Sequence, residues 1–140
     1  MTVVVKLGGR VVTVKDDPET LDEDAIERAA AAVAGTDEDV VVVHVGGRFG
    51  HHHATRHGVT RTEGTGDANA VREIHGAMNR LNDAIVDALA ATGVPAVPVH
   101  PLSAGSRDEA GGLELETDQV GTMLGEGFVP VLHGDVIAHA

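Results

Sequence analysis

The sequence predicts an α/β protein, a three-layer α/β/α sandwich with an open, mainly parallel sheet. Four apolar runs rich in valine show little polar alternation, which is typical of parallel strands covered on both faces. Helical segments alternate with these runs, as in βαβ architectures. The four expected strands are Val3–Leu7, Val40–Val45, Val94–Val99 and Phe128–Leu132. No repeat or linker interrupts the alternation, so residues 1–140 are expected to form a single domain.

Three helical segments between these strands carry start and stop signals. The first helix is expected to start at a capping box that begins at Thr20, and to stop at Gly35. The second starts near Asp67, keeps an apolar stripe along one face and ends at Gly93. A short third helix is expected to be capped by Thr117.

Composition excludes several classes of protein. Acidic residues outnumber basic ones by 22 to 10, and the net charge is −12, so the basic footprint of a nucleic-acid-binding protein is missing. Without cysteine there are no disulfides or thiolate metal sites. No apolar run is long enough to cross a membrane, and the N-terminus lacks a signal-peptide layout, so we expect a cytoplasmic protein. Dispersed acidity indicates adaptation to high intracellular salt; an ordinary acidic cytosolic protein is the alternative.

Glycine-rich segments follow three of the expected strands. Gly8 and Gly9 follow the first strand, Gly46 and Gly47 the second, and a turn at Gly134 the fourth. Ligands of open parallel sheets bind at the carboxyl ends of the strands, so these turns should meet at one rim. Glycines let backbone N–H groups approach an anion, and a following helix adds a favourable dipole. The spacing matches neither a Walker A loop nor a dinucleotide fingerprint.

The only lysines in the chain are Lys6 and Lys15, which bracket the first glycine turn. Lysine serves phosphate groups as a compact, mobile point charge, whereas arginine is a rigid fork. Phosphate chemistry is therefore the first functional hypothesis.

These motifs, in this order and spacing, resemble the amino acid kinase superfamily. Within it the chain is similar to the isopentenyl phosphate kinases, with the fosfomycin kinases as close relatives. The resemblance extends over the whole chain. It is carried by residues 6–9 with Lys15, residues 44–51, residues 78–82, residues 93–97 and residues 129–135.

The resemblance implies an amino acid kinase-like fold that transfers the γ-phosphate of ATP, accompanied by Mg²⁺, to isopentenyl phosphate. The product is isopentenyl diphosphate, made in the archaeal mevalonate route of isoprene biosynthesis. The acceptor is already an anion, so catalysis rests on positioning and charge neutralisation. By resemblance, the catalytic groups are Lys6, Lys15 and His51. The nucleotide phosphates would contact Lys6, Gly8, Gly9, Arg10 and Gly46. The acceptor phosphate would contact Val45, Gly47, Gly50, His51 and Gly134.

Three features depart from the family pattern. Val45 stands at the first glycine of the family's His-Gly-Gly-Gly motif, and a β-branched residue rarely adopts a positive φ. Arg10 and Arg48 replace small residues and either add contacts to an anion or fill its space. By the resemblance, we expect the family's second half, which supplies much of the nucleotide site, to lie outside these 140 residues. We expect an N-terminal, phosphate-acceptor half that works with a complementary nucleotide-binding half or as a homodimer.

Two other function classes stay open. One is an inactive remnant that folds and binds phosphate anions or dimerises without transferring a phosphoryl group. The other is a histidine-rich metal-binding module built on residues 51–53 and His57, which could take Zn²⁺ or Ni²⁺. Adjacent residues do not share one helix face, so we predict no dedicated metal site there.

The remaining histidines receive no catalytic role from the sequence. His44 and His133 fall at strand ends, where we expect hydrogen-bonded structural histidines. No motif includes His75, His100 or His139.

Overall fold

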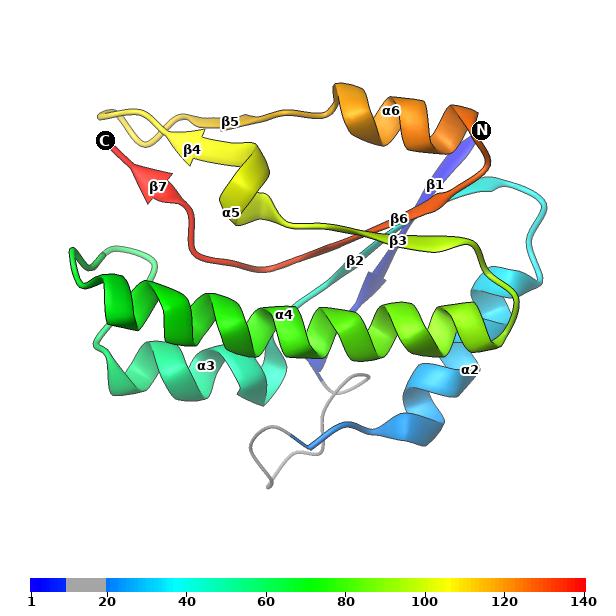
Figure 1. Ribbon diagram of the computed structural model, residues 1–140, viewed down its shortest axis with the longest axis horizontal. Coiled ribbons are helices and arrows are strands. Elements are labelled where there is room, and N and C mark those ends of the chain that lie inside the picture. The colour runs from blue at the N-terminus through cyan, green and yellow to red at the C-terminus, as the bar shows by residue number, and fades with distance from the viewer. Residues whose placement is uncertain (10–19) are drawn as a thin grey trace.

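A computed structural model describes residues 1–9 and 20–140 of the chain. Its centre is a parallel sheet of four strands in the order β1-β2-β6-β3 (Figure 1). The strands are β1 (Thr2–Leu7), β2 (Asp39–His44), β3 (Ala96–Val99) and β6 (Val129–His133). All four strands expected from the sequence are confirmed, with ends displaced by at most two residues.

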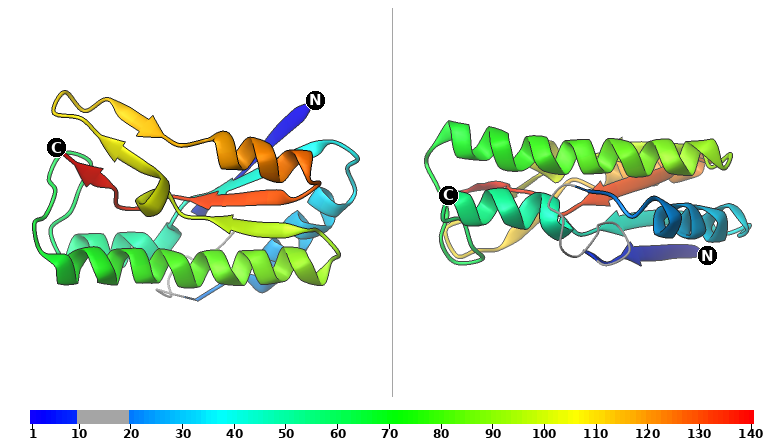
Figure 2. Two further views of the ribbon diagram at one scale, coloured as in Figure 1. Left: turned by 45° about the horizontal axis from the view of Figure 1, so that its top comes forward. Right: turned by 90° about the horizontal axis from the view of Figure 1, so that it is seen from below.

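Helices cover the sheet on both sides, so the expected three-layer sandwich is confirmed. On one face lie α2 (Glu23–Ala34), α3 (Gly47–Arg56) and α4 (Ala68–Ala91). The other face carries α6 (Asp118–Gly125), as Figures 1 and 2 show. The first face is well covered, because α4 packs on α2, α3 and two of the strands.

The core forms between α4 and the sheet. Val42 and Val131 from the two central strands are fully buried. The apolar stripe predicted for the longest helix packs against them at helical spacing. Its buried members are Ile74, Met78, Leu81, Ile85 and Leu89.

Several predicted helix ends are confirmed. Asp67 caps α4, and its side chain accepts a 2.8 Å hydrogen bond from the backbone N–H of Asn69. Gly35 is the C-cap of α2, and Thr117 occupies the N-cap position of α6 without a side-chain capping bond.

The capping box beginning at Thr20 is wrong. Helix α2 begins at Glu23, and its N-cap is Asp22, whose carboxylate accepts a 3.1 Å hydrogen bond from the N–H of Ala25. Aspartate is as good a cap as threonine and adds a negative charge at the positive end of the helix dipole. The helix therefore starts later than the capping-box pattern suggested.

A small second sheet was not predicted. It contains β4 (Gly105–Arg107), β5 (Leu113–Leu115) and β7 (Ala138–His139), and α5 (Pro101–Ala104) leads into it. Strands of two or three residues carry no hydrophobic period, so no sequence pattern announces them. Within residues 1–9 and 20–140, no helix combines the length and apolar character that a bilayer crossing requires.

Candidate anion site at the glycine rim

The hydrogen-bond ladder of the sheet continues beyond its last residues. The N–H of Val45 donates to the carbonyl of Leu7 at 3.2 Å, and the N–H of Gly134 donates to the carbonyl of His44 at 3.0 Å. The segments that leave β1, β2 and β6 are therefore held side by side at the carboxyl end of the sheet.

Glycines from these three segments lie against one another. A Cβ added to Gly9 would stand 3.3 Å from the Cα of Gly47, and a Cβ added to Gly134 would stand 3.9 Å from the backbone N of Gly46. We call these four residues the glycine rim. The convergence predicted for the strand exits is confirmed. Gly8 is more open, since a Cβ there would meet no atom within 4 Å.

Within the part of the chain that the structure describes, no side chain caps the start of helix α3 at the rim. Its N-cap is Gly46, which provides no side-chain capping bond, and Gly47 has a φ of 50°, in the left-handed region that favours glycine. The first N–H groups of a helix have no intrahelical acceptor, and the helix dipole makes this end electropositive. Such an end is suited to bind a phosphate or carboxylate.

Close packing behind the rim fixes the start of α3. A Cβ on Gly46 would lie 2.8 Å from Met78 Sδ and 3.2 Å from the Cα of Gly50, and one on Gly50 would lie 2.9 Å from the same sulfur. Phe49 is buried in the core at 5% exposure. The glycines thus bring α3 close to α4 and leave the first turn of α3 little freedom.

His51 lies on the outer side of α3, away from α4. It is exposed and lines a surface depression of about 370 Å³ together with Arg48, His52, Thr55 and Arg56. Most of these side chains carry or can accept a positive charge. The expected catalytic histidine therefore stands in a cationic groove one turn into the helix that starts at the rim.

Two histidines of this cluster, His53 and His57, face α4. His57 Nε2 lies 2.6 Å from the carboxylate of Glu73, and Arg56 Nη1 lies 3.9 Å from it. The hydrogen bond from His57 lowers the pKa of Glu73. The cluster is thus divided between two faces of α3, although the rings of His52 and His53 meet edge to face with centroids 5.2 Å apart. Among the described residues, no three His, Cys, Asp or Glu side chains converge to hold a metal ion.

The remaining expected site residues are placed as follows. Lys6 is exposed and lies on the sheet face opposite Leu7, because side chains alternate along β1. Both backbone polar groups of Val45 are engaged, its N–H by Leu7 and its carbonyl by the ring of His44. Arg10 and Lys15 lie outside the described residues.

Sequence reasoning missed a polar network directly under the rim. His44 Nδ1 lies 3.2 Å from the carbonyl of Val45, and its Nε2 lies 2.8 Å from Asn82 Oδ1 on α4. Both side chains are fully buried. Burial lowers the pKa of His44, so its neutral form is favoured.

The network continues on the neighbouring strand. His133 Nδ1 lies 2.9 Å from the carbonyl of Gly134, and its Nε2 lies 2.7 Å from His100 Nδ1. His75 Nδ1 on α4 lies 2.7 Å from Asp135, a carboxylate with no exposed surface. Burial is the main reason that the pKa of His133 is lowered.

Two spacings in the sequence could have indicated this network. His75 and Asn82 are seven residues apart, which places them on one face of a helix two turns apart. His133 and Asp135 are two apart at the end of a strand. His100 carries no such signal, because it meets His133 only through the pairing of β3 with β6.

Comparison with known proteins gives the family. The profile of the amino acid kinase family matches residues 1–140. Isopentenyl phosphate kinase of Haloferax volcanii is 62% identical over 140 residues, which cover 99% of this chain and 56% of that protein. The isopentenyl phosphate kinase of Methanothermobacter thermautotrophicus is 34% identical, with 96% of this chain and 53% of that protein covered.

Solved structures agree with the sequence relatives. An X-ray structure of an isopentenyl phosphate kinase superimposes with a TM-score of 0.88 at 30% identity, covering 100% of this chain and 59% of that one. Aspartate kinase from Synechocystis, at 18% identity and a TM-score of 0.69, shares the fold. The chain spans about half the length of the curated relatives it matches. With its whole length matched, the chain belongs to the amino acid kinase family.

Proposed function

We propose that this chain is the phosphate-acceptor half of an isopentenyl phosphate kinase and binds isopentenyl phosphate at the glycine rim. The observation that supports this most is the uncapped start of α3 at Gly46 and Gly47, where backbone amides converge with Gly9 and Gly134. The 62% identity to the Haloferax enzyme gives the substrate class.

The proposed reaction is transfer of the γ-phosphoryl group of ATP. An oxygen of the acceptor phosphate attacks the γ-phosphorus, the bond to the β-γ bridging oxygen breaks, and ADP leaves. Mg²⁺ bound with ATP would neutralise part of the charge. The acceptor needs no deprotonation by the protein, so the chain's contribution is alignment and positive potential.

The charged site residues and the rim amides have separate roles in this proposal. Lys6 and Lys15 would neutralise the nucleotide phosphates and the group in transfer, as lysine ammonium groups commonly do. His51, with the groove that it shares with Arg48, would donate to the acceptor phosphate. The rim amides would hold that phosphate from the side of α3.

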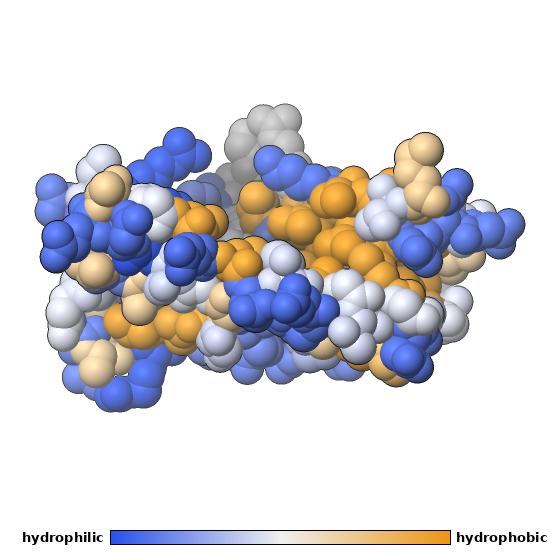
Figure 3. Space-filling view, turned by 90° about the horizontal axis from the view of Figure 1, so that it is seen from above, coloured by the Kyte–Doolittle hydropathy of each residue, from blue (hydrophilic) through white to orange (hydrophobic). Residues whose placement is uncertain are grey.

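An open apolar face indicates where a nucleotide-binding half would pack. On the α6 side of the sheet, Val41, Val43 and Leu132 are only half buried and Val4 is 65% exposed. No residue of α6 is fully buried. Figure 3 shows the apolar surface on this side.

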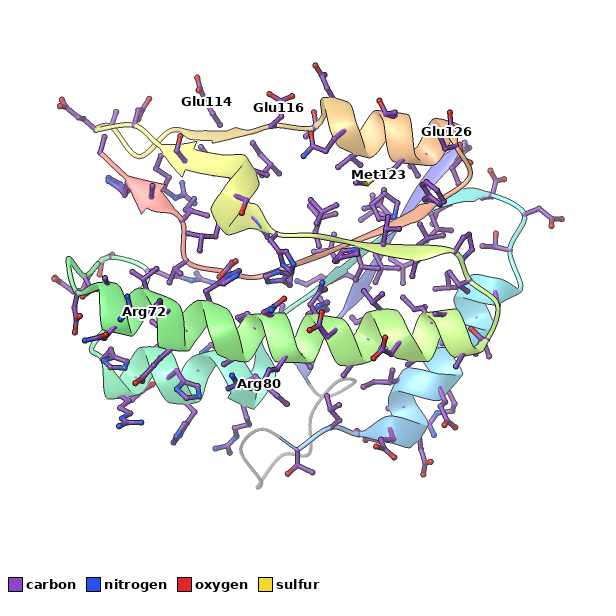
Figure 4. All side chains as sticks on the ribbon, in the orientation of Figure 1. Arg72, Arg80, Glu114, Glu116, Met123 and Glu126 are labelled. Carbon is purple, nitrogen blue, oxygen red and sulfur yellow. The ribbon has the colours of Figure 1, made fainter. Side chains whose placement is uncertain are left out.

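The borders of this face are acidic. Figure 4 shows Met123 on the side of α6 that faces the sheet, with Glu114, Glu116 and Glu126 along the outer edge of the same side. An apolar surface with a charged rim is typical of a protein interface. A complementary half, or a second copy in a homodimer, would cover it.

A second candidate is a remnant that binds phosphate without turnover. Val45 supports it, because its N–H is taken by Leu7 and cannot reach an acceptor phosphate.

Titration calorimetry in molar KCl separates the two candidates. Saturable heat with isopentenyl phosphate, and none with isopentenol, is expected for the acceptor half; heat from inorganic phosphate alone favours the remnant. A coupled ADP-release assay should show little turnover unless a nucleotide-binding half is added. If activity is found, Lys15→Met should abolish it, and full activity in that variant would refute the role of Lys15.

The acidic surface adds a proposal about the environment of the protein. A net charge of −12 on a chain with two lysines fits a cytoplasm rich in KCl, where ions screen the self-repulsion of the carboxylates.

A further inference from the structure

Two buried histidines end adjacent strands of the sheet and make the same contact. His44 and His133 are partners in the parallel register of β2 and β6, with side chains 0% and 3% exposed. Each ring places Nδ1 on the carbonyl of the next residue, His44 on Val45 at 3.2 Å and His133 on Gly134 at 2.9 Å. The two rings are stacked, with centroids 5.8 Å apart.

These contacts hold the peptides from which the rim is built. In a trans peptide the C=O and the N–H point in opposite directions. Fixing the carbonyl of Val45 therefore fixes the direction of the N–H of Gly46, the N-cap of α3. In the same way His133 sets the peptide that joins Gly134 to Asp135. Glycine has little conformational preference of its own, so the peptides of the rim need such an external restraint.

The partners of the rings determine which nitrogen carries the proton. A neutral imidazole has one N–H, so a ring that donates from Nδ1 must accept at Nε2. For His133, the acceptor nitrogen Nε2 lies 2.7 Å from His100 Nδ1, which then donates. His100 in turn packs edge to face on His75, whose own Nδ1 is bound to Asp135.

Asn82 completes the same arrangement for His44. Asn82 Oδ1 lies 2.8 Å from His44 Nε2, while the buried Asn82 Nδ2 has no hydrogen-bond partner among the residues that the structure describes. A 180° flip of the Asn82 amide places its Nδ2 beside His44 Nε2. Asn82 Nδ2 then donates a hydrogen bond to Nε2, and the His44 proton is left on Nδ1. With Asn82 Oδ1 beside Nε2, a His44 imidazolium could donate from both ring nitrogens, but burial disfavours its charge.

We propose that His44 and His133 are positioning residues, which donate from Nδ1 to the carbonyls of Val45 and Gly134 and so aim the amides of Gly46 and Asp135 at a phosphate bound at the rim. Asn82 and His100 fix the tautomer of each ring. This inference rests on the proposed function, since it assigns the rim an anion.

Paired substitutions separate positioning from simple filling of space. Asparagine can place its side-chain N–H where Nδ1 stood, and glutamine can reach the place of Nε2 but fills more of the volume of the ring. If His44 only fills space, His44→Gln should be the milder change. If it positions the Val45 peptide, His44→Asn should be the milder change. The same reasoning applies to His133→Asn and His133→Gln.

The first experiment uses the 140-residue chain without a ligand. Long-range proton–nitrogen NMR spectra at neutral pH should show His44 and His133 as neutral rings protonated at Nδ1. The backbone amide resonance of Gly46 should stay near its wild-type position in His44→Asn and move in His44→Gln. A proton on Nε2, an imidazolium, or a Gly46 resonance that moves more in His44→Asn would overturn the proposal.

The second experiment measures binding of isopentenyl phosphate by calorimetry. The loss of one oriented amide should weaken binding about tenfold in His44→Gln and less than about threefold in His44→Asn. Equal or reversed losses would overturn the positioning role. If the wild-type chain binds no phosphate, the proposed function is refuted. The Gly46 resonance would still decide whether His44 orients the peptide between Val45 and Gly46.

Discussion

Lowering the pH from about 7.5 to about 5.5 should destabilise this protein through its two buried, neutral histidines. The side chains of His44 and His133 are 0% and 3% exposed, and burial lowers the pKa of both below the ordinary value of 6.5. In the unfolded chain these rings regain that value and bind more protons than in the fold. Stability from this source is complete above pH 6.5 and is lost as the pH falls below it.

The magnitude follows from the protons taken up on unfolding. Near pH 5.5 an unfolded imidazole is about nine-tenths protonated, and a folded ring that stays neutral costs about 1.4 kcal/mol relative to neutral pH. The two rings together cost up to about 2.7 kcal/mol. That is a large part of the free energy of unfolding of a typical small domain.

Urea unfolding followed by circular dichroism at the two pH values, in constant KCl, measures this loss. Circular dichroism suits the chain because it has no tryptophan or tyrosine. His44→Asn removes one titrating ring and should reduce the pH-dependent loss by up to about 1.4 kcal/mol. His139→Asn, a change at an exposed ring, is the matched control. An unchanged pH dependence in His44→Asn, or a protein that gains stability on acidification, would refute the reasoning.

Three further results are expected. Leu81 is fully buried in α4, so Leu81→Ala should lower the free energy of unfolding by about 3 kcal/mol in urea titrations. The control Asp83→Ala, at an exposed position of the same helix, should lower it by less than about 0.5 kcal/mol. The added methyl group of Gly50→Ala meets only the flexible side chain of Met78, so in a double-mutant cycle Met78→Ala should recover about 1 kcal/mol of the stability lost. The methyl group of Gly46→Ala also meets the backbone of Gly50, so Met78→Ala should not restore stability there. Raising KCl should raise the melting temperature, because ions screen a net charge of −12; a melting temperature that falls with salt would contradict the salt-adapted reading.

The sheet and the glycine rim could be predicted because both follow from local patterns. Valine-rich runs mark buried parallel strands, and parallel strands bring their carboxyl ends to one edge, so Gly9, Gly47 and Gly134 had to meet there. The helix cap at Asp67 was equally local. The cap of the first helix was not decided locally, since Thr20 and Asp22 both offer a capping oxygen and only the helix start chooses between them.

The pairings within the polar network under the rim could not be predicted, because its members come from distant segments. His44 meets Asn82 across 38 residues, and His75 meets Asp135 across 60. Each pairing depends on how α4 crosses the sheet, which the sequence patterns do not specify. The small sheet of β4, β5 and β7 was missed for a related reason, since Ala138–His139 becomes a strand only by pairing with Gly105–Arg107.

Anion binding at the glycine rim can be tested residue by residue, by adding isopentenyl phosphate to the nitrogen-15-labelled chain in molar KCl. The backbone amides of Gly46, Gly47 and Arg48 should shift together and saturate, and isopentenol should leave them in place. Resonances of these amides that stay fixed while the phosphate saturates other parts of the chain would contradict an acceptor site at the start of α3.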